Sequence, residues 1–157
     1  MKIIKKFLIF TVTLILSQNS LDLYGAQAIA TRPVTNCSIE IGDAHISRNL
    51  FSTRGLIAVK VNAKSKCDKP IRNLVLTVEI YKEGLITNHR VSVHAISIKE
   101  LIFANRIVKN QGAYVKCRTN KWTRYYGVAF AEALVEGRHM KTLPVRSENI
   151  ERFQCGN

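Results

Sequence analysis

The sequence lacks the motifs by which many enzymes are identified. It contains no glycine-rich phosphate loop, no His-Glu-x-x-His pair and no Gly-x-Ser-x-Gly nucleophile turn. These absences remove the sequence basis for a nucleotide-dependent enzyme, a zinc protease or a serine hydrolase of the common types. We therefore predict no cofactor and no catalytic residue, and we favour binding over catalysis.

Long apolar runs are also lacking. The one near the N-terminus follows three lysines and spans residues 7–16, about half of the ~20 residues that cross a hydrocarbon core. A basic start, a short apolar stretch and the small-residue pattern Ala26-Gln27-Ala28 are the parts of a secretory signal. We predict a signal peptide at residues 1–28 that is removed on export, and we disfavour the alternative of an uncleaved anchor.

Acidic residues are few, with 11 Asp and Glu against 24 Lys and Arg. Removing residues 1–28 removes three lysines and one aspartate, so the net charge falls only from +13 to +11. The remaining 129 residues, 29–157, suit one secreted domain. A basic exported domain tends to meet anionic partners, so we predict an acidic protein or an anionic polymer or surface, nucleic acid included. The plain alternative is that the charge serves solubility.

Closely spaced cysteine pairs are absent, although the chain has four cysteines, Cys37, Cys67, Cys117 and Cys155. Without a Cys-x-x-Cys pair a zinc site is disfavoured, and we predict no metal. An even count in an exported chain instead predicts two disulfides and an extracellular or periplasmic location. Three connectivities are possible. Strand geometry favours Cys37–Cys67 and Cys117–Cys155, because the start of one antiparallel strand lies beside the end of its neighbour.

Apolar residues alternate with polar ones in several short segments, which predicts a mainly β fold. The candidate strands are residues 37–41, 56–61, 74–81, 91–95, 113–117, 126–134 and 139–145. Their spacing indicates a small, disulfide-linked antiparallel β-sandwich that is immunoglobulin-like in architecture. The immunoglobulin signature itself is missing, because Trp122 closely follows Cys117 and Val115 stands where the signature has tyrosine.

Two segments fit both a helix and a strand. Ser97 and Glu100 have the spacing of a capping box, and the apolar residues that follow fit one helical face, so we predict a short helix near 98–109. In residues 126–134, bulky side chains alternate with glycine and alanine. A helix that ends at Gly137 is the alternative there. We predict a strand whose small face allows close approach of a second layer.

The best candidate for a functional surface is a segment in which cations interleave with aromatic residues. Its members are Lys116, Arg118, Lys121, Trp122, Arg124, Tyr125 and Tyr126. Such a surface can hold an anion by charge while a base or sugar ring stacks on a flat side chain. We predict that it binds an anion or a partner, although alternate residues of a strand face opposite ways and only some can act together. In the alternative, Trp122 and Tyr126 fill the edge of the core.

Other constellations support different functions. A second basic cluster, interpreted as a charged rim, comprises Lys60, Lys64, Lys66, Lys69 and Arg72. A small secreted hydrolase or cationic toxin of the ribonuclease type would need His89, His139 and Lys141 to converge on a phosphate. An envelope inhibitor or immunity protein that blocks a partner enzyme fits the same composition. We keep both as alternatives to the non-catalytic binding protein.

Overall fold

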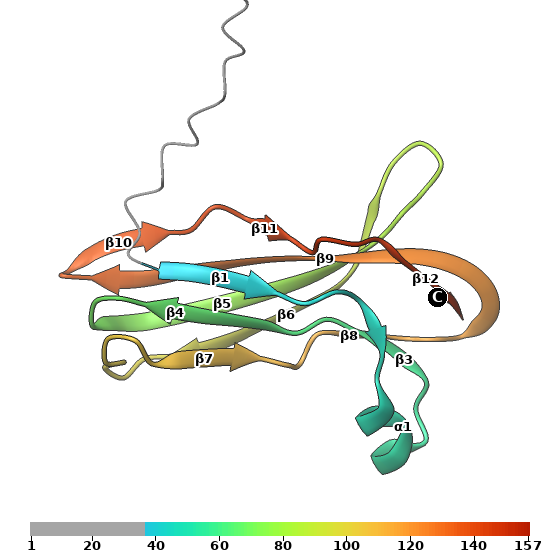
Figure 1. Cartoon of the computed structure of the whole chain (residues 1–157), viewed down its shortest axis with the longest axis horizontal. Helices are drawn as coiled ribbons and strands as arrows, with labels where there is room; N and C mark the ends of the chain where they lie inside the picture. The colour runs from blue at the N-terminus through green and yellow to red at the C-terminus, as the bar shows by residue number, and fades with distance from the viewer. Residues whose placement is uncertain (1–36) are drawn as a thin grey trace, which may run out of the picture. The chain divides into compact units, whose positions relative to one another are not determined.

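The computed structural model describes residues 37–157 as twelve strands and one helix (Figure 1). The elements are β1 (Cys37–Ile41), β2 (His45–Ile46), α1 (Arg48–Arg54), β3 (Ala58–Lys60), β4 (Ala63–Cys67), β5 (Ile71–Lys82), β6 (His89–Ile98), β7 (Ile107–Asn110), β8 (Tyr114–Lys116), β9 (Thr119–Val135), β10 (Arg138–Lys141), β11 (Val145–Arg146) and β12 (Glu151–Gly156). The predicted signal peptide, residues 1–28, lies outside the described residues. Within residues 37–157, α1 is too short to span a membrane.

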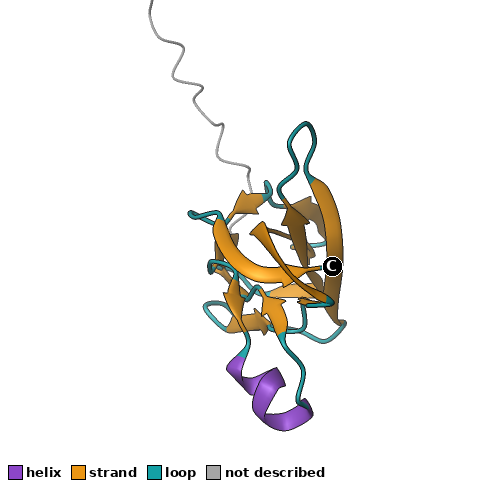
Figure 2. Ribbon diagram, turned by 90° about the vertical axis from the view of Figure 1, so that its right-hand side faces the viewer, coloured by secondary structure: helices purple, strands orange, loops and turns teal. Residues whose placement is uncertain are grey.

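The strands form two layers (Figure 2). The larger is a six-stranded antiparallel sheet with the order β10-β9-β5-β6, in which β11 and β12 also pair with β9. The strands β10, β11 and β12 therefore follow one another along a single edge of β9. The smaller layer consists of the sheets β1-β4-β7 and β2-β3-β8, which continue one another because the same three chain segments pass through both. The predicted antiparallel β-sandwich is confirmed.

The order of the segments compares closely with the immunoglobulin order. If the segments are lettered A to G along the chain, A-B-E forms the smaller layer and D-C-F-G the larger sheet. In the constant-type immunoglobulin order, D lies with A, B and E. Here β6 is D, and it pairs with β5 instead. The architecture is thus immunoglobulin-like, with one segment in the other sheet.

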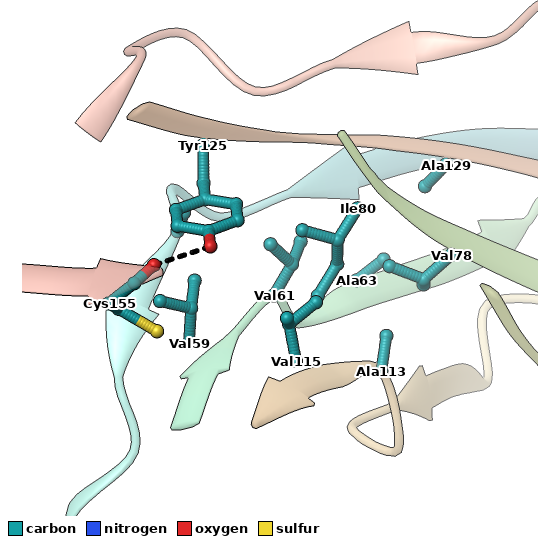
Figure 3. Packing of buried hydrophobic residues seen from close by; sticks show 11 residues of the cluster. Val59, Val61, Ala63, Val78, Ile80, Ala113, Val115, Tyr125, Ala129 and Cys155 are labelled. Carbon is teal, nitrogen blue, oxygen red and sulfur yellow. Dashed lines mark hydrogen bonds between the residues drawn. The ribbon is translucent and has the colours of Figure 1, made fainter. Parts of the chain in front are cut away.

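The core lies between the layers, where β5 contributes alternate residues. Leu74, Leu76, Val78 and Ile80 are each no more than 1 % exposed. Val78 and Ile80 pack with Val59 and Val61 of the smaller layer (Figure 3), and Leu74 and Leu76 belong to a second cluster that includes Cys67. Burial of each large aliphatic side chain contributes ~1.5–3 kcal/mol, so the alternation in β5 fixes which face of the sheet turns inward.

In residues 126–134 of β9 the small residues face the core and the bulky ones face outward. Ala129, Ala131 and Ala133 are buried, and a Cβ atom at Gly127 would lie 2.5 Å from Cγ1 of Val61. The smaller layer thus approaches β9 closely, as the alternation predicted. The large side chains of this segment are left on the outer face of the sheet.

Both predicted disulfides are present, with the predicted pairing. Cys37 and Cys67 lie directly opposite each other on β1 and β4, so their bridge joins two neighbouring strands of the smaller layer. Cys117, just after β8, is joined to Cys155 of β12, and this bridge links the two layers. Beside it, the hydroxyl of the buried Tyr125 donates a hydrogen bond of 2.6 Å to the Cys155 carbonyl oxygen (Figure 3).

The predicted helix near 98–109 is wrong. Ile98 ends β6, Ile102 forms an isolated bridge with Ile71, and β7 begins at Ile107. Of the apolar residues of this segment, Ile98, Ile102 and Val108 contact the core, and Asn105 has a φ of 64°, which interrupts a right-handed helix. Tertiary burial outweighs the local capping pattern here.

The helix of this structure is α1, which precedes β3 and was not predicted. Ser47 caps its N-terminus by accepting a hydrogen bond from the Leu50 backbone, and Gly55 ends it in the left-handed conformation. Ser47 and Gly55 were the signals available in the sequence. The strand predicted at residues 56–61 also differs from the structure. β3 covers only part of it, and the chain then becomes extended again as β4, which includes Lys64 and Lys66, beyond the predicted end of the strand.

Candidate functional site

The outward face of β9 carries an aromatic side chain at every fourth residue, Trp122, Tyr126 and Phe130. Residues four apart on a strand share a face. A cation lies over each ring: Lys141 Nζ is 5.0 Å from the centroid of Phe130, Arg146 Cζ 3.9 Å from Tyr126, and Arg152 Cζ 5.0 Å from Trp122. We name these six residues the cation–aromatic row.

The spacing of the row comes from the strand register. The three cations belong to β10, β11 and β12, and they lie opposite Glu132, Val128 and Arg124 of β9. Each step along β9 is therefore four residues, or ~13 Å at the usual rise of a strand. The row follows one edge of the large sheet for ~26 Å.

The cations differ in how far they are neutralised. Lys141 Nζ is 2.8 Å from Glu132 Oε1. Arg146 and Arg152 are exposed and form no ion pair with any residue from 37 to 157. Arg146 and Arg152 are therefore the two cations of the row that are free to meet an anion.

The aromatic rings hold the guanidinium groups in place. A cation–π contact at an exposed site contributes ~0.5–1 kcal/mol, enough to favour one arrangement of a flexible side chain. A guanidinium lying on a ring still presents N–H donors at its edge to a phosphate, sulfate or carboxylate. Tyr126 is only 7 % exposed, whereas Trp122 is 52 % exposed. Of these two rings, only Trp122 is therefore open enough to stack on a ligand as well.

A buried carboxylate fixes the middle of the row. Glu79 is 7 % exposed, and it accepts hydrogen bonds from Arg90 Nη1 at 2.6 Å and from the Tyr81 hydroxyl at 2.8 Å. The hydrogen bond to Glu79 raises the pKa of Tyr81, and the same carboxylate raises the pKa of Arg90. Tyr81 in turn stacks on Tyr126, with ring centroids 5.3 Å apart. This chain of contacts positions the ring on which Arg146 lies.

The carboxylate of Glu132 modifies the end of the row. Its pKa is lowered, chiefly by the hydrogen bond from Lys141 and also by the charges of Lys141 and His139, against an opposing effect of burial. The carboxylate therefore stays ionised near neutral pH and competes with any external anion for Lys141. Arg146 and Arg152 have no such competitor among the described residues.

The structure divides the predicted binding residues among several environments. Trp122, Arg124 and Tyr126 share the outward face of β9, although Arg124 Nε is engaged by Glu83 Oε2 at 3.0 Å. Tyr125 is completely buried, so it is a core residue and is not available to a partner. Lys116 belongs to β8 in the smaller layer.

The last two predicted binding residues lie near the start of β9. Arg118 precedes the strand, and Lys121 alternates with Trp122, so it does not share the face of the row. Both side chains are exposed. Trp122 and Tyr126 are thus the predicted residues that the structure brings into the row.

Sequence reasoning missed Arg146 and Arg152 and considered Lys141 only as a catalytic residue. Each of these cations is 11 to 30 residues from its aromatic partner along the chain. In the sequence, the three cations follow a segment rich in aromatic residues, and this order was only a weak indication that they act together. Pairing them with particular rings requires the register of three separate strands.

The second basic cluster does not form one surface. Lys64 pairs with Glu40 at 2.8 Å, and Lys69 pairs with Glu136 at 2.7 Å. The hydrogen bond from Lys69 lowers the pKa of Glu136. Two of the five cations of this cluster are thus engaged by carboxylates, and Arg72 lies on β5 of the other layer.

The residues of the ribonuclease-like alternative are held apart. His89 is opposite Lys82, which is opposite Tyr125, whereas Lys141 is opposite Glu132. Seven residues of β9 separate these positions, a distance of ~23 Å. His139 instead approaches Glu132, at 3.9 Å. Within residues 37–157, no three histidine, cysteine or carboxylate side chains are grouped as a metal site requires.

The cation–aromatic row thus combines a regular spacing, exposed guanidinium groups and supporting aromatic rings. The function of the row is therefore inferred from the chemistry of these residues. No protein-family model, curated protein or solved structure matches the chain.

Proposed function

We propose that this protein is a non-catalytic binding protein that engages a linear anionic macromolecule along the cation–aromatic row. The observation that carries the proposal is the repetition of one unit, a cation held over a ring, three times at equal intervals on one face. A single small anion needs one convergent pocket. A row along a strand edge offers successive contacts to a chain of repeated charges.

The charge of the whole protein supports the same proposal. A net charge of +11 over residues 29–157 attracts a polyanion from a distance, and the row then supplies oriented donors at short range. Such binding weakens as salt concentration rises, because salt screens the charges and makes the release of counterions less favourable. Two disulfides fit an oxidising compartment, so we place this binding outside the cytoplasm.

The test uses polyphosphate as the probe and isothermal titration as the measurement, repeated over a series of NaCl concentrations. We expect Arg146→Gln/Arg152→Gln to weaken binding about tenfold or more and to reduce the salt dependence. The matched control is Arg48→Gln/Arg54→Gln, which removes the same charge from α1. Because exposed charges act over about a Debye length, ~10 Å, the control should bind almost as well as the unchanged protein.

Three results would contradict this proposal. Equal losses in the two double variants would mean that net charge, and not the row, drives binding. A complete lack of binding at low salt would remove the polyanion as a ligand class. A salt-resistant one-to-one complex with a protein, in place of polyanion binding, would indicate the inhibitor alternative.

A further inference from the structure

The loop between β5 and β6 projects from the sheet as a narrow hairpin, seen in yellow-green in Figure 1 and again in Figure 2. Its outermost side chains are Leu85, which is 107 % exposed, and Ile86, which is 96 % exposed. Two adjacent aliphatic side chains therefore contribute nothing to the core. The middle of a tight turn is usually occupied by Gly, Pro, Asn, Asp or Ser.

The conformation of this turn is fixed by close backbone contacts. A Cβ atom at Gly84 would clash with the carbonyl oxygen of Thr87, so only glycine fits at the first position of this tight bend. The backbone amide of Glu83 still donates to the Arg124 carbonyl at 2.9 Å, which anchors the base of the hairpin to β9. The bend therefore presents Leu85 and Ile86 together, away from an anchored base.

Cations and a tryptophan surround the base of this hairpin. Lys82 and Arg90 flank the loop on β5 and β6. On β9, Arg124 bonds to the hairpin, and Trp122 lies two residues beyond it with 52 % of its surface exposed. Glu83, the carboxylate within the loop, is paired with Arg124, and Arg90 is paired with the buried Glu79. Lys82 is therefore the cation at this base that has no ion pair within residues 37–157. An aliphatic tip above a basic, tryptophan-bearing base matches the chemistry of the boundary between lipid chains and anionic headgroups.

We propose that the Leu85–Ile86 tip inserts into lipid bilayers that contain anionic lipids, while Lys82 at its base contacts the headgroups. The tip is a second binding site whose two aliphatic residues lie outside the cation–aromatic row, although Trp122 at its base belongs to that row. A charged polymer offers nothing to two aliphatic side chains, whereas a bilayer removes both from water. The positive charge where the hairpin joins the sheet favours a membrane, and not an apolar pocket of a protein, as the partner of the tip.

Flotation with vesicles tests this proposal, using either phosphatidylcholine alone or equal parts phosphatidylcholine and phosphatidylglycerol. We expect the disulfide-bonded full chain to bind the mixed vesicles more strongly. Leu85→Ser/Ile86→Ser should weaken that binding about tenfold or more. The matched control is Leu101→Ser/Phe103→Ser, since these side chains are 39 % and 66 % exposed and lie near Ile71 at the opposite end of β5. The control should bind like the unchanged protein.

Tryptophan fluorescence reports insertion directly, because Trp122 is the single tryptophan of the chain. In a Trp122→Phe background, Leu85→Trp should shift its emission to the blue and be quenched by brominated lipid. Phe103→Trp in the same background should show neither effect. Thermal unfolding should be unchanged in Leu85→Ser/Ile86→Ser, since both replaced side chains are almost completely exposed.

Equal vesicle binding by the two double serine variants would overturn the proposal, as would an absence of vesicle binding or of quenching at residue 85. Failure here is distinguishable from failure of the polyanion proposal. Leu85→Ser/Ile86→Ser should bind soluble polyphosphate normally. Conversely, insertion of the tip into vesicles would support the membrane proposal even if polyphosphate did not bind.

Discussion

Single residues of β9 show how closely the two layers approach. Gly127 lies under Val61 and Ile41, and its amide donates to the Ser147 hydroxyl at 3.0 Å. Any side chain at this position would enter a space that neighbouring side chains already fill. The absence of a Cβ atom is therefore what allows the smaller layer to pack here.

Gly127→Ala tests this packing. The new methyl group would lie 2.5 Å from Val61 Cγ1 and 2.8 Å from Ile41 Cδ1. Overpacking of this kind costs ~1–3 kcal/mol, which exceeds the ~0.4–1 kcal/mol that Gly-to-Ala gains through the unfolded chain. We expect a net loss of ~1–2 kcal/mol in urea unfolding.

The control for this change is Gly42→Ala. The nearest atom to a Cβ there is the Asn62 carbonyl oxygen at 3.8 Å, and Gly42 does not have positive φ. We expect stability to stay level or to rise by up to ~1 kcal/mol. Equal effects at the two glycines would show that close packing is not what selects glycine at residue 127.

At the scale of the elements, hydrogen bonds join the loop between β1 and β2 to the loop between β11 and β12. The carboxylate of Asp43, between β1 and β2, accepts hydrogen bonds from the Asn149 backbone amide at 2.9 Å and from its side-chain amide at 2.8 Å. These bonds, the backbone one first, lower the pKa of Asp43 below its ordinary value of 3.8. The contact ties the smaller layer to the connection between β11 and β12.

The stability that this contact provides should depend on pH. Because the folded state lowers the pKa of Asp43, the stabilisation is fully present above the pKa of the unfolded chain. It is lost as pH falls through the lower, folded-state pKa. We expect Asp43→Ala to lower the melting temperature at neutral pH, and the difference from the unchanged protein to vanish under strongly acid conditions.

Calorimetry over a pH series measures this effect. Asp68→Ala is the control, because the Asp68 carboxylate is exposed and has no side-chain ion pair within residues 37–157. It should change the melting temperature little at any pH. A deficit of Asp43→Ala that stayed constant down to the lowest pH would exclude the carboxylate as its cause.

At the scale of the whole molecule, the two disulfides act on different parts. Cys37–Cys67 reinforces two strands that are already paired, whereas Cys117–Cys155 joins one layer to the other. Their sequence separations are 30 and 38 residues. Chain entropy therefore assigns each a similar stabilisation, ~4 kcal/mol, and what distinguishes them is position.

Cys117→Ser/Cys155→Ser should destabilise the protein by ~4 kcal/mol in urea unfolding, a large part of the stability of a small domain. We also expect faster hydrogen exchange in β12, since the bridge holds the end of this strand. Cys37→Ser/Cys67→Ser should give a similar loss without that local effect. If β12 exchanged equally fast in both variants, the bridge between the layers would have no special role.

Alternation and cysteine spacing by themselves determine much of this protein. In β5, the alternate aliphatic residues from Leu74 to Ile80 must leave water, and that requirement alone fixes the inward face. The pairing of Cys37 with Cys67 follows from antiparallel neighbours, because the start of β1 at Cys37 lies beside the end of β4 at Cys67. Both inferences depend on local periodicity, which a sequence displays directly.

Only the tertiary structure decided the elements and the surface that depend on distant partners. Ile102 lies on extended backbone because it bridges to Ile71, a partner that its own neighbours in sequence do not reveal. Arg146 lies on Tyr126, and Arg152 on Trp122, because two strands settle at particular registers along the edge of β9. Sequence determines which residues seek burial or charge, but the side chains that meet across a sheet are decided by strand register, which is set by the packing of the whole domain.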